Sequence, residues 1–233
     1  MQILFEDNHL IAVYKEAGQI VQGDKTGDKP LSEMVADYLV VKHQKPGKAF
    51  IGVVHRLDRP VEGIILFAKT SKALSRMNKL FRENEVHKRY LAIVNAPPRI
   101  PDGILRQNLY RNTTLNKSFV VDKNHPNSKE AILRFHTVGR SDRYTLLSVS
   151  LITGRHHQIR CQLASLGASI RGDLKYGAPR SNKNGGISLL AYEIRFTHPV
   201  SKEEILLRAP LPKEPLWQAF SHQIASDDKR LDF

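Results

Sequence analysis

Three short polar segments contain residue types that could carry out chemistry: HRLDRP at 55–60, HKRY at 87–90 and TGRHHQIR at 153–160. Each is expected to lie where a strand meets a loop, and a rigid framework commonly presents functional groups at such junctions. A carboxylate can act as a nucleophile or take a proton. A phenol supplies a stacking face and a hydroxyl, and a guanidinium within ~4 to 6 Å of a carboxylate lowers its pKa by roughly one to three units.

Each of these groups also has a purely structural explanation when it is considered alone. Asp58 stands before a proline-containing turn, where aspartate often makes local backbone hydrogen bonds. Arg160 could be a solvated cation on a helix, and Tyr90 could pack against the core from a strand. Only the combination of the three segments favours a functional interpretation.

A metal site is the main alternative for the histidines of these segments, which are His55, His87, His156 and His157. Adjacent histidines diverge on a helix or strand, and no acidic partner recurs three or four residues away. The chain has a single cysteine, Cys161, which can form neither an internal disulfide nor a thiolate cluster. We therefore expect no metal, and a reducing cytoplasm is the simplest location.

The composition indicates a globular protein with a polyanionic partner. The 233 residues are 41% hydrophobic, and 36 Lys and Arg against 23 Asp and Glu give a net charge of +13. Such an excess favours nucleic acid, although a protein that is merely basic and soluble would show the same balance. The first residues lack a basic leader, and no apolar stretch approaches the ~20 residues needed to cross a bilayer. We expect a cytoplasmic protein without membrane contact.

The elements that must position these groups can be read from residue patterning. Residues 3–5 and 10–14 resemble two strands joined at Asp7 and Asn8, and residues 64–68 resemble a buried strand. Thr70 or Ser71 could cap a following helix. Helical spacing places the following side chains on two buried faces: Leu31, Met34, Val35, Tyr38 and Leu39 on the first, and Leu74, Met77, Leu80 and Phe81 on the second.

Further strands are expected at 90–94, 133–135, 147–151 and 190–196, with helices at 156–166 and in PLWQAF near the C-terminus. Many strands with a few interspersed helices and no regular βα alternation indicate an α+β fold around a mixed, largely antiparallel central sheet with flanking helices and loops. No linker divides the chain, so we expect one domain over residues 1–233.

Several blocks occur in a fixed order: HRLD at 55–58, GIILFAKT at 63–70, KRYLAI at 88–93, TGRHHQIR at 153–160 and GDLKYG at 172–177. This series resembles the RluA-type pseudouridine synthases, and the likeness runs from about residue 3 to about residue 220. The resemblance implies the pseudouridine synthase fold, with an active-site cleft across the sheet. It also implies isomerisation of uridine to pseudouridine within RNA, without cofactor or metal.

The resemblance also implies roles for individual residues. Asp58 is the essential carboxylate, and the sequence leaves open whether it acts as nucleophile or as base. Arg160 pairs with Asp58, and Tyr90 lies against the target base, where it can assist proton removal from carbon 5. Arg56 inserts into the RNA to replace the flipped base, which must leave the stack before chemistry can reach it.

The chain departs from the family pattern after the aspartate. The family commonly has Thr-Ser-Gly there, whereas this chain has Pro60-Val61-Glu62-Gly63, and the sequence does not explain the charge of Glu62. His157 matches the usual histidine of the third block, while His156 replaces a residue that is often threonine. We expect no separate N-terminal RNA-binding domain before the catalytic region, and we therefore expect substrate selection to rest on that region.

The expected partner is RNA, and the residues assigned to RNA binding are Arg56, His55, Arg155, His157, Lys72, Arg76 and Lys79. The last three could equally be a phosphate-tracking surface or a solvated exterior. Large-subunit ribosomal RNA is favoured as substrate, with transfer RNA as the alternative. A non-catalytic RNA-binding assembly factor of the same fold is the competing interpretation, and a nucleoside hydrolase would release free uracil. A monomer is expected.

Overall fold

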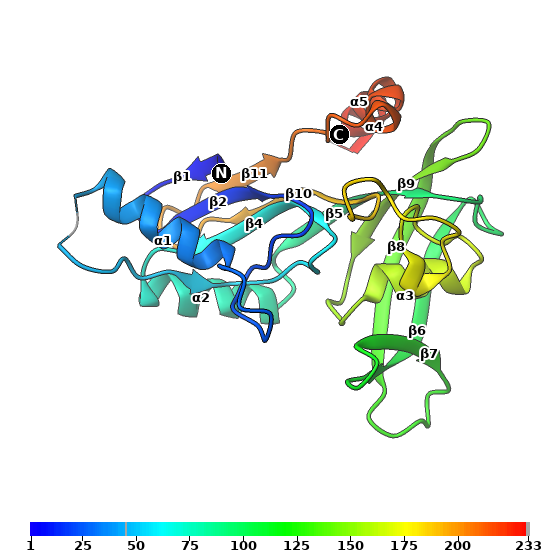
Figure 1. Cartoon of the computed structure of the whole chain (residues 1–233), viewed down its shortest axis with the longest axis horizontal. Coiled ribbons are helices and arrows are strands. Elements are labelled where there is room, and N and C mark those ends of the chain that lie inside the picture. The colour runs from blue at the N-terminus through cyan, green and yellow to red at the C-terminus, as the bar shows by residue number, and fades with distance from the viewer. Residues whose placement is uncertain (45, 232–233) are drawn as a thin grey trace. The chain divides into compact units, whose positions relative to one another are not determined.

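The computed structural model describes residues 1–44 and 46–231, which form two compact units (Figure 1). The first unit contains Met1–Lys88 and Ala191–Ala209. The second contains Arg89–Leu190 and the chain from Pro210 onwards. The α+β class with a largely antiparallel sheet, which the sequence predicts, is confirmed.

The first unit is built on a sheet whose strand order is β1, β2, β4, β10 and β11. These strands span Gln2–Glu6, Leu10–Lys15, Glu62–Ala68, Leu189–Thr197 and Glu204–Arg208, and the short β3, Gly52–Val53, also pairs with β4. β1 and β2 form the expected hairpin. Its turn is fixed by the Asp7 carboxylate, which accepts the backbone N–H groups of His9 and Leu10 at 2.7 and 2.6 Å.

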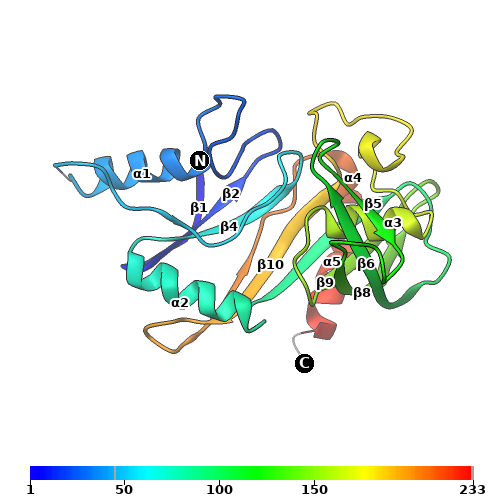
Figure 2. The same cartoon turned by 90° about the horizontal axis from the view of Figure 1, so that it is seen from below.

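Two helices of the first unit accompany this sheet (Figures 1 and 2): α1, Leu31–Lys42, and α2, Ser71–Arg82. Thr70 is the N-cap of α2, and its hydroxyl accepts the Ala73 N–H at 3.1 Å, as its position predicts. On α2 the buried side chains are Ala73 and Met77, while Leu74, Leu80 and Phe81 are half-buried. The predicted apolar face therefore exists, but it is less deeply buried than expected.

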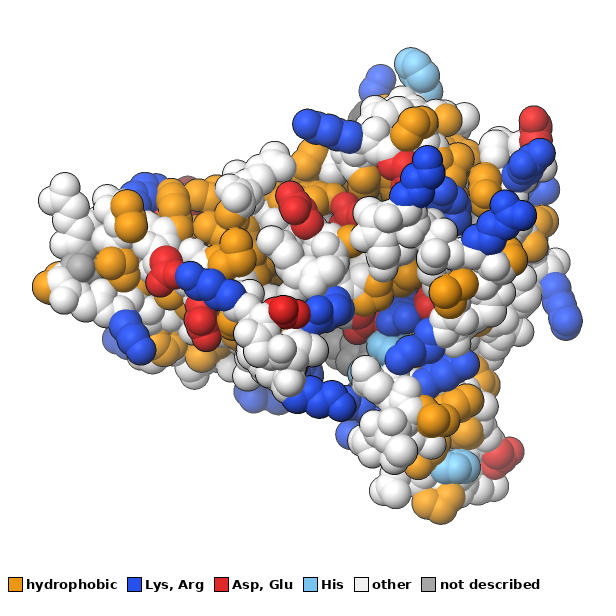
Figure 3. Space-filling view, in the orientation of Figure 1, with side chains coloured by type: hydrophobic (Ala, Val, Ile, Leu, Met, Phe, Trp, Pro, Cys, Tyr) orange, Lys and Arg blue, Asp and Glu red, His pale blue; other side chains and the backbone are white. Residues whose placement is uncertain are grey.

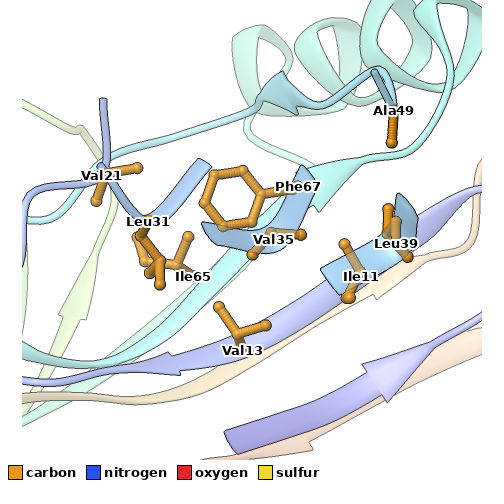
Figure 4. Packing of buried hydrophobic residues seen from close by; sticks show 9 residues of the cluster. All are labelled: Ile11, Val13, Val21, Leu31, Val35, Leu39, Ala49, Ile65 and Phe67. Carbon is orange, nitrogen blue, oxygen red and sulfur yellow. The ribbon is translucent and has the colours of Figure 1, made fainter. Parts of the chain in front are cut away.

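The core between α1 and the sheet is shown in Figure 4. It contains Ile11 and Val13 of β2, Ile65 and Phe67 of β4, and Leu31, Val35 and Leu39 of α1, together with Val21 and Ala49. The helix face predicted from spacing is confirmed. Burying each of the larger side chains stabilises the fold by about 1.5 to 3 kcal/mol. This packing fixes β2 and β4, the two strands whose ends adjoin the loop of Asp58.

The second unit contains the antiparallel strands β5, β9, β8, β6 and β7 in that order. They span His87–Val94, Thr145–Leu151, Lys129–Arg140, Asp102–Asn112 and Lys117–Val121. β5 begins two residues before the unit boundary and β10 has its first two residues in this unit. The β6–β7 hairpin is not anticipated by the sequence, because its strands alternate only weakly between apolar and polar residues.

The helices of the second unit are α3, Gln158–Ser165, α4, Pro215–Ala219, and α5, Ser221–Leu231, together with a 3₁₀ turn, η1, at Leu174–Tyr176. α3 and α4 fall within the predicted segments, whereas α5 is not predicted. Buried ion pairs hold α5, because Asp227 and Asp228 both bind the guanidinium of Arg89. His136 on β8 also contacts Asp227 at 2.8 Å. In the described part of the chain, no helix is both long and apolar enough to span a membrane.

Candidate functional site

Asp58 lies on the loop between β3 and β4, where a backbone turn fixes its position. The Asp58 carbonyl accepts the Val61 N–H at 3.0 Å, and the carbonyl of Arg59 accepts the Gly18 N–H at 2.9 Å. The carboxylate-bearing residue is half-buried. The loop thus presents Asp58 from a hydrogen-bonded backbone turn.

A buried lysine supports this loop from β2. Lys15 has an exposed fraction of 0%, and its ammonium donates to the carbonyl oxygens of Val61, Arg59 and Glu16 at 2.7, 3.0 and 3.2 Å. Burial lowers the pKa of Lys15 to about 8, although the negative charges of Asp58 and Glu62 act in the opposite direction and raise it. This role could not be predicted from the sequence, because a lysine within a short apolar stretch is ordinarily exposed.

Glu62, the charge that the sequence left unexplained, has a partner on β2. The Tyr14 hydroxyl donates to the Glu62 carboxylate at 2.9 Å. Burial and the Glu62 charge raise the pKa of Tyr14, so the phenol stays protonated and keeps its donor. Glu62 is therefore a partner of Tyr14 at the start of β4.

Gly63, the first residue of the GIILFAKT block, is required by a close approach of two strands. Its φ is +120°, and a Cβ at this position would lie 2.3 Å from the carbonyl oxygen of Ala191 on β10. No side chain fits that space, because the three nearest atoms, the O, N and C of Ala191, all belong to the backbone. The glycine thus allows the strand that follows Asp58 to pair closely.

The remaining residues of the HRLDRP segment differ in exposure. Arg56 is exposed, and its predicted RNA contact stays a prediction. His55 accepts the backbone N–H of Leu66 through Nε2 at 3.1 Å and stacks on Phe81, with ring centroids 5.2 Å apart. Burial and Lys88 lower the pKa of His55 to about 3, so the ring is neutral. These contacts give His55 a supporting role, and its predicted RNA contact stays a prediction.

Arg59 faces a different part of the first unit. Its guanidinium lies 2.8 Å from Asp28 and 3.6 Å from Asp24 and donates to the Thr26 hydroxyl at 2.8 Å. These groups are exposed, so each ion pair contributes at most about 1 kcal/mol. The arginine following Asp58 thus fastens the loop around residues 24–28.

Tyr90 lies on β5 of the second unit, opposite Val149 of β9, and its side chain is buried. The preceding residue, Arg89, is held by Asp227 and Asp228 of α5. The strand that carries the predicted base-contacting tyrosine is therefore fastened on one side by β9 and at its start by the C-terminal helix.

Arg160 lies on α3 and is engaged by a carboxylate that the sequence did not single out. Its Nε and Nη2 donate to the two oxygens of Asp173 at 2.7 and 2.9 Å, and both side chains are buried. A guanidinium offers five N–H donors, so this bidentate pair uses two of them. Asp173 belongs to the GDLKYG block, and the family resemblance of that block was the feature of the sequence that could have pointed to it. The buried pair fixes the plane and direction of the Arg160 guanidinium.

The TGRHHQIR and GDLKYG blocks are further joined through Tyr176. Its hydroxyl accepts the Ser118 N–H at 2.8 Å and lies 3.0 Å from Nδ1 of His157, whose ring stacks on His156 at 3.8 Å. His157 is 7% exposed and adopts a left-handed backbone, with φ 53°, where it caps α3. Burial and neighbouring cations, Arg160 first, lower the pKa of His157 to about 2. The ring is thus a neutral packing element, and its predicted contact with RNA stays a prediction.

Basic side chains surround this part of the second unit, and Figure 3 shows Lys, Arg and His gathered over the region of α3. Arg155 is exposed, and its Nε donates to the Glu130 carbonyl at 2.9 Å. Lys175 donates to the Asn116 carbonyl at 3.1 Å, and Lys117 lies over the Tyr176 ring at 5.0 Å from its centroid. A cationic surface with aromatic groups beside it suits a phosphate-bearing ligand.

The first unit has its own basic surface along α2. Residues of α2 line two surface pockets, and these residues include Lys72, Arg76 and Lys79. His9 and Thr70 complete the pocket at the start of the helix, while Arg82 lines the other. The three predicted RNA-binding residues of α2 are thus brought together on one exposed surface.

Asp58 belongs to the first unit, whereas Tyr90 and Arg160 both belong to the second. The structure therefore unites two of the three predicted catalytic residues within one unit. The predicted pairing of Arg160 with Asp58 and the predicted cleft across the sheet stay predictions. Over residues 1–44 and 46–231, no group of three or more His, Cys, Asp or Glu side chains is arranged to hold a metal ion.

Comparison with solved structures defines the class of fold. The chain superposes on Human RNA Pseudouridylate Synthase Domain Containing 4 with a TM-score of 0.77 at 22% identity, covering 96% of this chain and 93% of that one. Human RNA Pseudouridylate Synthase Domain Containing 1 gives a TM-score of 0.69 at 20% identity, with 94% and 86% covered. The fold is that of the pseudouridine synthases, as the resemblance implied.

Sequence comparison then places the chain in a family. Residues 9–165 match the family model described as RNA pseudouridylate synthase, and the chain belongs to this family. Ribosomal large subunit pseudouridine synthase C of Buchnera aphidicola is 33% identical over 217 residues, which are 90% of this chain and 66% of that protein. An uncharacterized RNA pseudouridine synthase of Chlorobaculum parvum is 33% identical, with 91% and 71% covered. The chain spans just under two thirds of the length of the Buchnera relative.

Proposed function

We propose that this protein is an RNA pseudouridine synthase, an isomerase that converts specific uridines of a structured RNA to pseudouridine. The observation that carries the proposal is the family match over residues 9–165, a range that includes Asp58, Tyr90 and Arg160. Each of the three is held by a defined structural support rather than lying on a loose surface segment. Retention of all three argues against a binding protein that has lost the reaction.

In the proposed reaction, the bond between C1′ of the ribose and N1 of uracil breaks, and a bond between C1′ and C5 forms. N1 ends with a proton and C5 loses one, so atoms and charge balance without an oxidant or reductant. Asp58 supplies the carboxylate, which acts either as nucleophile or as base. Tyr90 lies against the base and serves removal of the C5 proton, and Arg160 pairs with Asp58.

RNA binding is assigned to the two basic surfaces and to the HRLD loop. Arg56 takes the place of the flipped uridine, and Arg155 contributes to the cationic surface of the second unit. Lys72, Arg76 and Lys79 contact phosphates along α2, a role supported by the grouping of the three side chains beside two pockets. No metal or cofactor is required, and the protein acts as a monomer in the cytoplasm.

We assign large-subunit ribosomal RNA as the substrate, because several relatives about 30% identical bear that substrate in their names. The assignment concerns the RNA class and not the particular uridine. Transfer RNA is the alternative, and the experiment below separates the two when ribosomal and transfer RNA are assayed as purified fractions.

The proposal is tested by release of tritium from RNA labelled at C5 of uridine, extracted from cells that lack the gene. The wild-type protein should release label from the ribosomal fraction, and Asp58→Asn should release none while still binding RNA. Release from the transfer RNA fraction alone would overturn the substrate assignment. Absence of release from every fraction would overturn the proposed activity, and free uracil among the products would indicate a hydrolase instead.

A further inference from the structure

The Lys15 ammonium has one hydrogen-bond acceptor for each of its three N–H donors. A protonated lysine has three N–H donors and no acceptor. In this structure three carbonyl oxygens, those of Val61, Arg59 and Glu16, lie 2.7, 3.0 and 3.2 Å from Nζ. Two of the three belong to the loop that immediately follows Asp58. Lys15 thus binds that loop on both sides of Pro60.

These bonds determine where Asp58 can lie. The carbonyl of Asp58 accepts the N–H of Val61, and Val61 in turn gives its own carbonyl to Lys15. Gly18 donates to the Arg59 carbonyl that Lys15 also binds. The backbone within three residues of the carboxylate is therefore tied to the end of β2. A tied backbone restricts the direction in which the Asp58 side chain leaves the chain.

Glu62, the residue after Val61, contributes a further contact between β2 and the chain that follows Asp58. It accepts the Tyr14 hydroxyl at 2.9 Å, and its charge, like that of Asp58, favours the protonated form of Lys15. Tyr14 and Lys15 are neighbours on β2, and successive side chains of a strand point to opposite faces. The start of β4 is therefore held from both faces of β2. A cation without solvent contact needs such a countercharge, because burial strongly disfavours an unpaired ion.

We propose that Lys15, Tyr14 and Glu62 form a clamp that positions Asp58 for the reaction, with Glu62 supplying the countercharge for Lys15. The inference rests on the proposed function, because it assigns the clamp to the carboxylate of that reaction. It gives a physical reason for the acidic residue at position 62, which the sequence did not explain. All three are positioning residues, since they act through the loop and not on the substrate.

The clamp has a pH dependence that distinguishes it from simple packing. A neutral amine has two donors and a lone pair, so one of the three carbonyls would lose its hydrogen bond. Burial places the pKa of Lys15 at about 8, with Asp58 and Glu62 raising it and Arg59 lowering it. Lys15 thus keeps all three of its hydrogen bonds to the backbone below this pH and loses one of them above it, so the loop after Asp58 is held less firmly there. Removing the Glu62 charge lowers the pKa further and moves the alkaline decline of activity to lower pH.

The test compares Glu62→Gln and Tyr14→Phe with Tyr38→Phe, a matched control. The Tyr38 hydroxyl also donates to a glutamate, Glu6 at 3.2 Å, but Tyr38 lies on α1. Tritium release is measured in single turnovers at saturating labelled RNA, and RNA affinity is measured by filter binding. Because small misplacements of a reacting group are costly, we expect Glu62→Gln to lower the rate constant about tenfold or more and Tyr14→Phe about threefold or more. RNA affinity should change by less than about twofold, and Tyr38→Phe should leave both quantities unchanged.

A wild-type rate constant in Glu62→Gln would overturn the clamp. Equal losses of the rate constant in Tyr14→Phe and Tyr38→Phe would also overturn it, and so would variants that change RNA affinity alone. The alkaline limb of the pH profile must also shift to lower pH in Glu62→Gln. If Glu62→Gln does not fold, Tyr14→Phe still tests the clamp, because it removes the hydrogen bond to Glu62 and retains every charge. Asp58→Asn separates the two levels: if it is inactive while the clamp variants are normal, only the clamp fails. If Asp58→Asn is as active as wild type, the proposed function itself fails.

Discussion

The burial of Lys15 predicts a specific pH dependence of folding stability. The perturbation is Lys15→Met, which removes the titrating group from the interior of the first unit. In the folded chain the pKa of Lys15 is about 8, whereas the ordinary value is 10.5. Each unit of difference corresponds to about 1.4 kcal/mol, so the buried ammonium disfavours the folded state by about 3 kcal/mol at neutral pH relative to a neutral amine.

The sign of the pH effect follows from which state holds the proton. Below pH 8 Lys15 is protonated in both the folded and the unfolded chain, and its contribution is constant. Between about pH 8 and pH 10.5 the unfolded chain retains a proton that the folded chain has released, so the free energy of unfolding rises with pH. From pH 7 to pH 9, titration of Lys15 alone should stabilise the wild type by about 1 kcal/mol.

The assay is urea unfolding followed by circular dichroism at both pH values for the wild type, Lys15→Met and Lys15→Arg. Other titrating groups affect all three proteins alike, so the difference between wild type and either variant isolates Lys15. The free energy of unfolding of the wild type minus that of either variant should increase by about 1 kcal/mol between pH 7 and pH 9. The two variants should keep a constant difference from each other. A difference between wild type and Lys15→Met that is the same at pH 7 and pH 9 would refute the assignment of a buried, titrating ammonium.

Three further substitutions test other parts of the site. Asp173→Asn leaves the buried Arg160 without its carboxylate, so we expect a loss of about 3 kcal/mol or more in the free energy of unfolding and a slower reaction, measured by urea unfolding and tritium release; unchanged stability would contradict the buried pair. Gly63→Ala introduces a Cβ against the Ala191 carbonyl, and a loss of at least about 2 kcal/mol in urea unfolding is expected; a neutral effect would show that β4 and β10 are not so close. Tyr90→Phe keeps the ring and removes the hydroxyl, so tritium release should slow while RNA binding is retained; an equal loss of both would show that the tyrosine serves binding alone.

Much of the first unit was predictable because its signals are local. The face of α1 formed by Leu31, Val35 and Leu39 repeats at helical spacing, and the packing follows the pattern. Asp7 in the β1–β2 turn and Thr70 at the start of α2 act through hydrogen bonds two or three residues away. Such contacts can be recognised from a short window of sequence.

The contacts that hold the candidate site are long-range, and the sequence alone did not reveal them. In the sequence, Lys15 simply interrupts an apolar stretch, and two of its three acceptors lie 44 and 46 residues further along the chain. The pairing of Arg160 with Asp173 depends on how α3 and the loop after it pack. The β6–β7 hairpin and α5 were missed because they carry few buried apolar residues, and α5 is held largely by ion pairs with Arg89.

We propose that the carboxylate of Asp58 is essential for the isomerisation of uridine in RNA. The decisive measurement is a position-by-position map of pseudouridine in total RNA from cells that lack the gene and from such cells to which it is returned as wild type or as Asp58→Asn. We expect at least one pseudouridine in large-subunit ribosomal RNA to disappear without the gene, to return with the wild type and to stay absent with Asp58→Asn. A pseudouridine map that is identical in all of these cells would contradict the account.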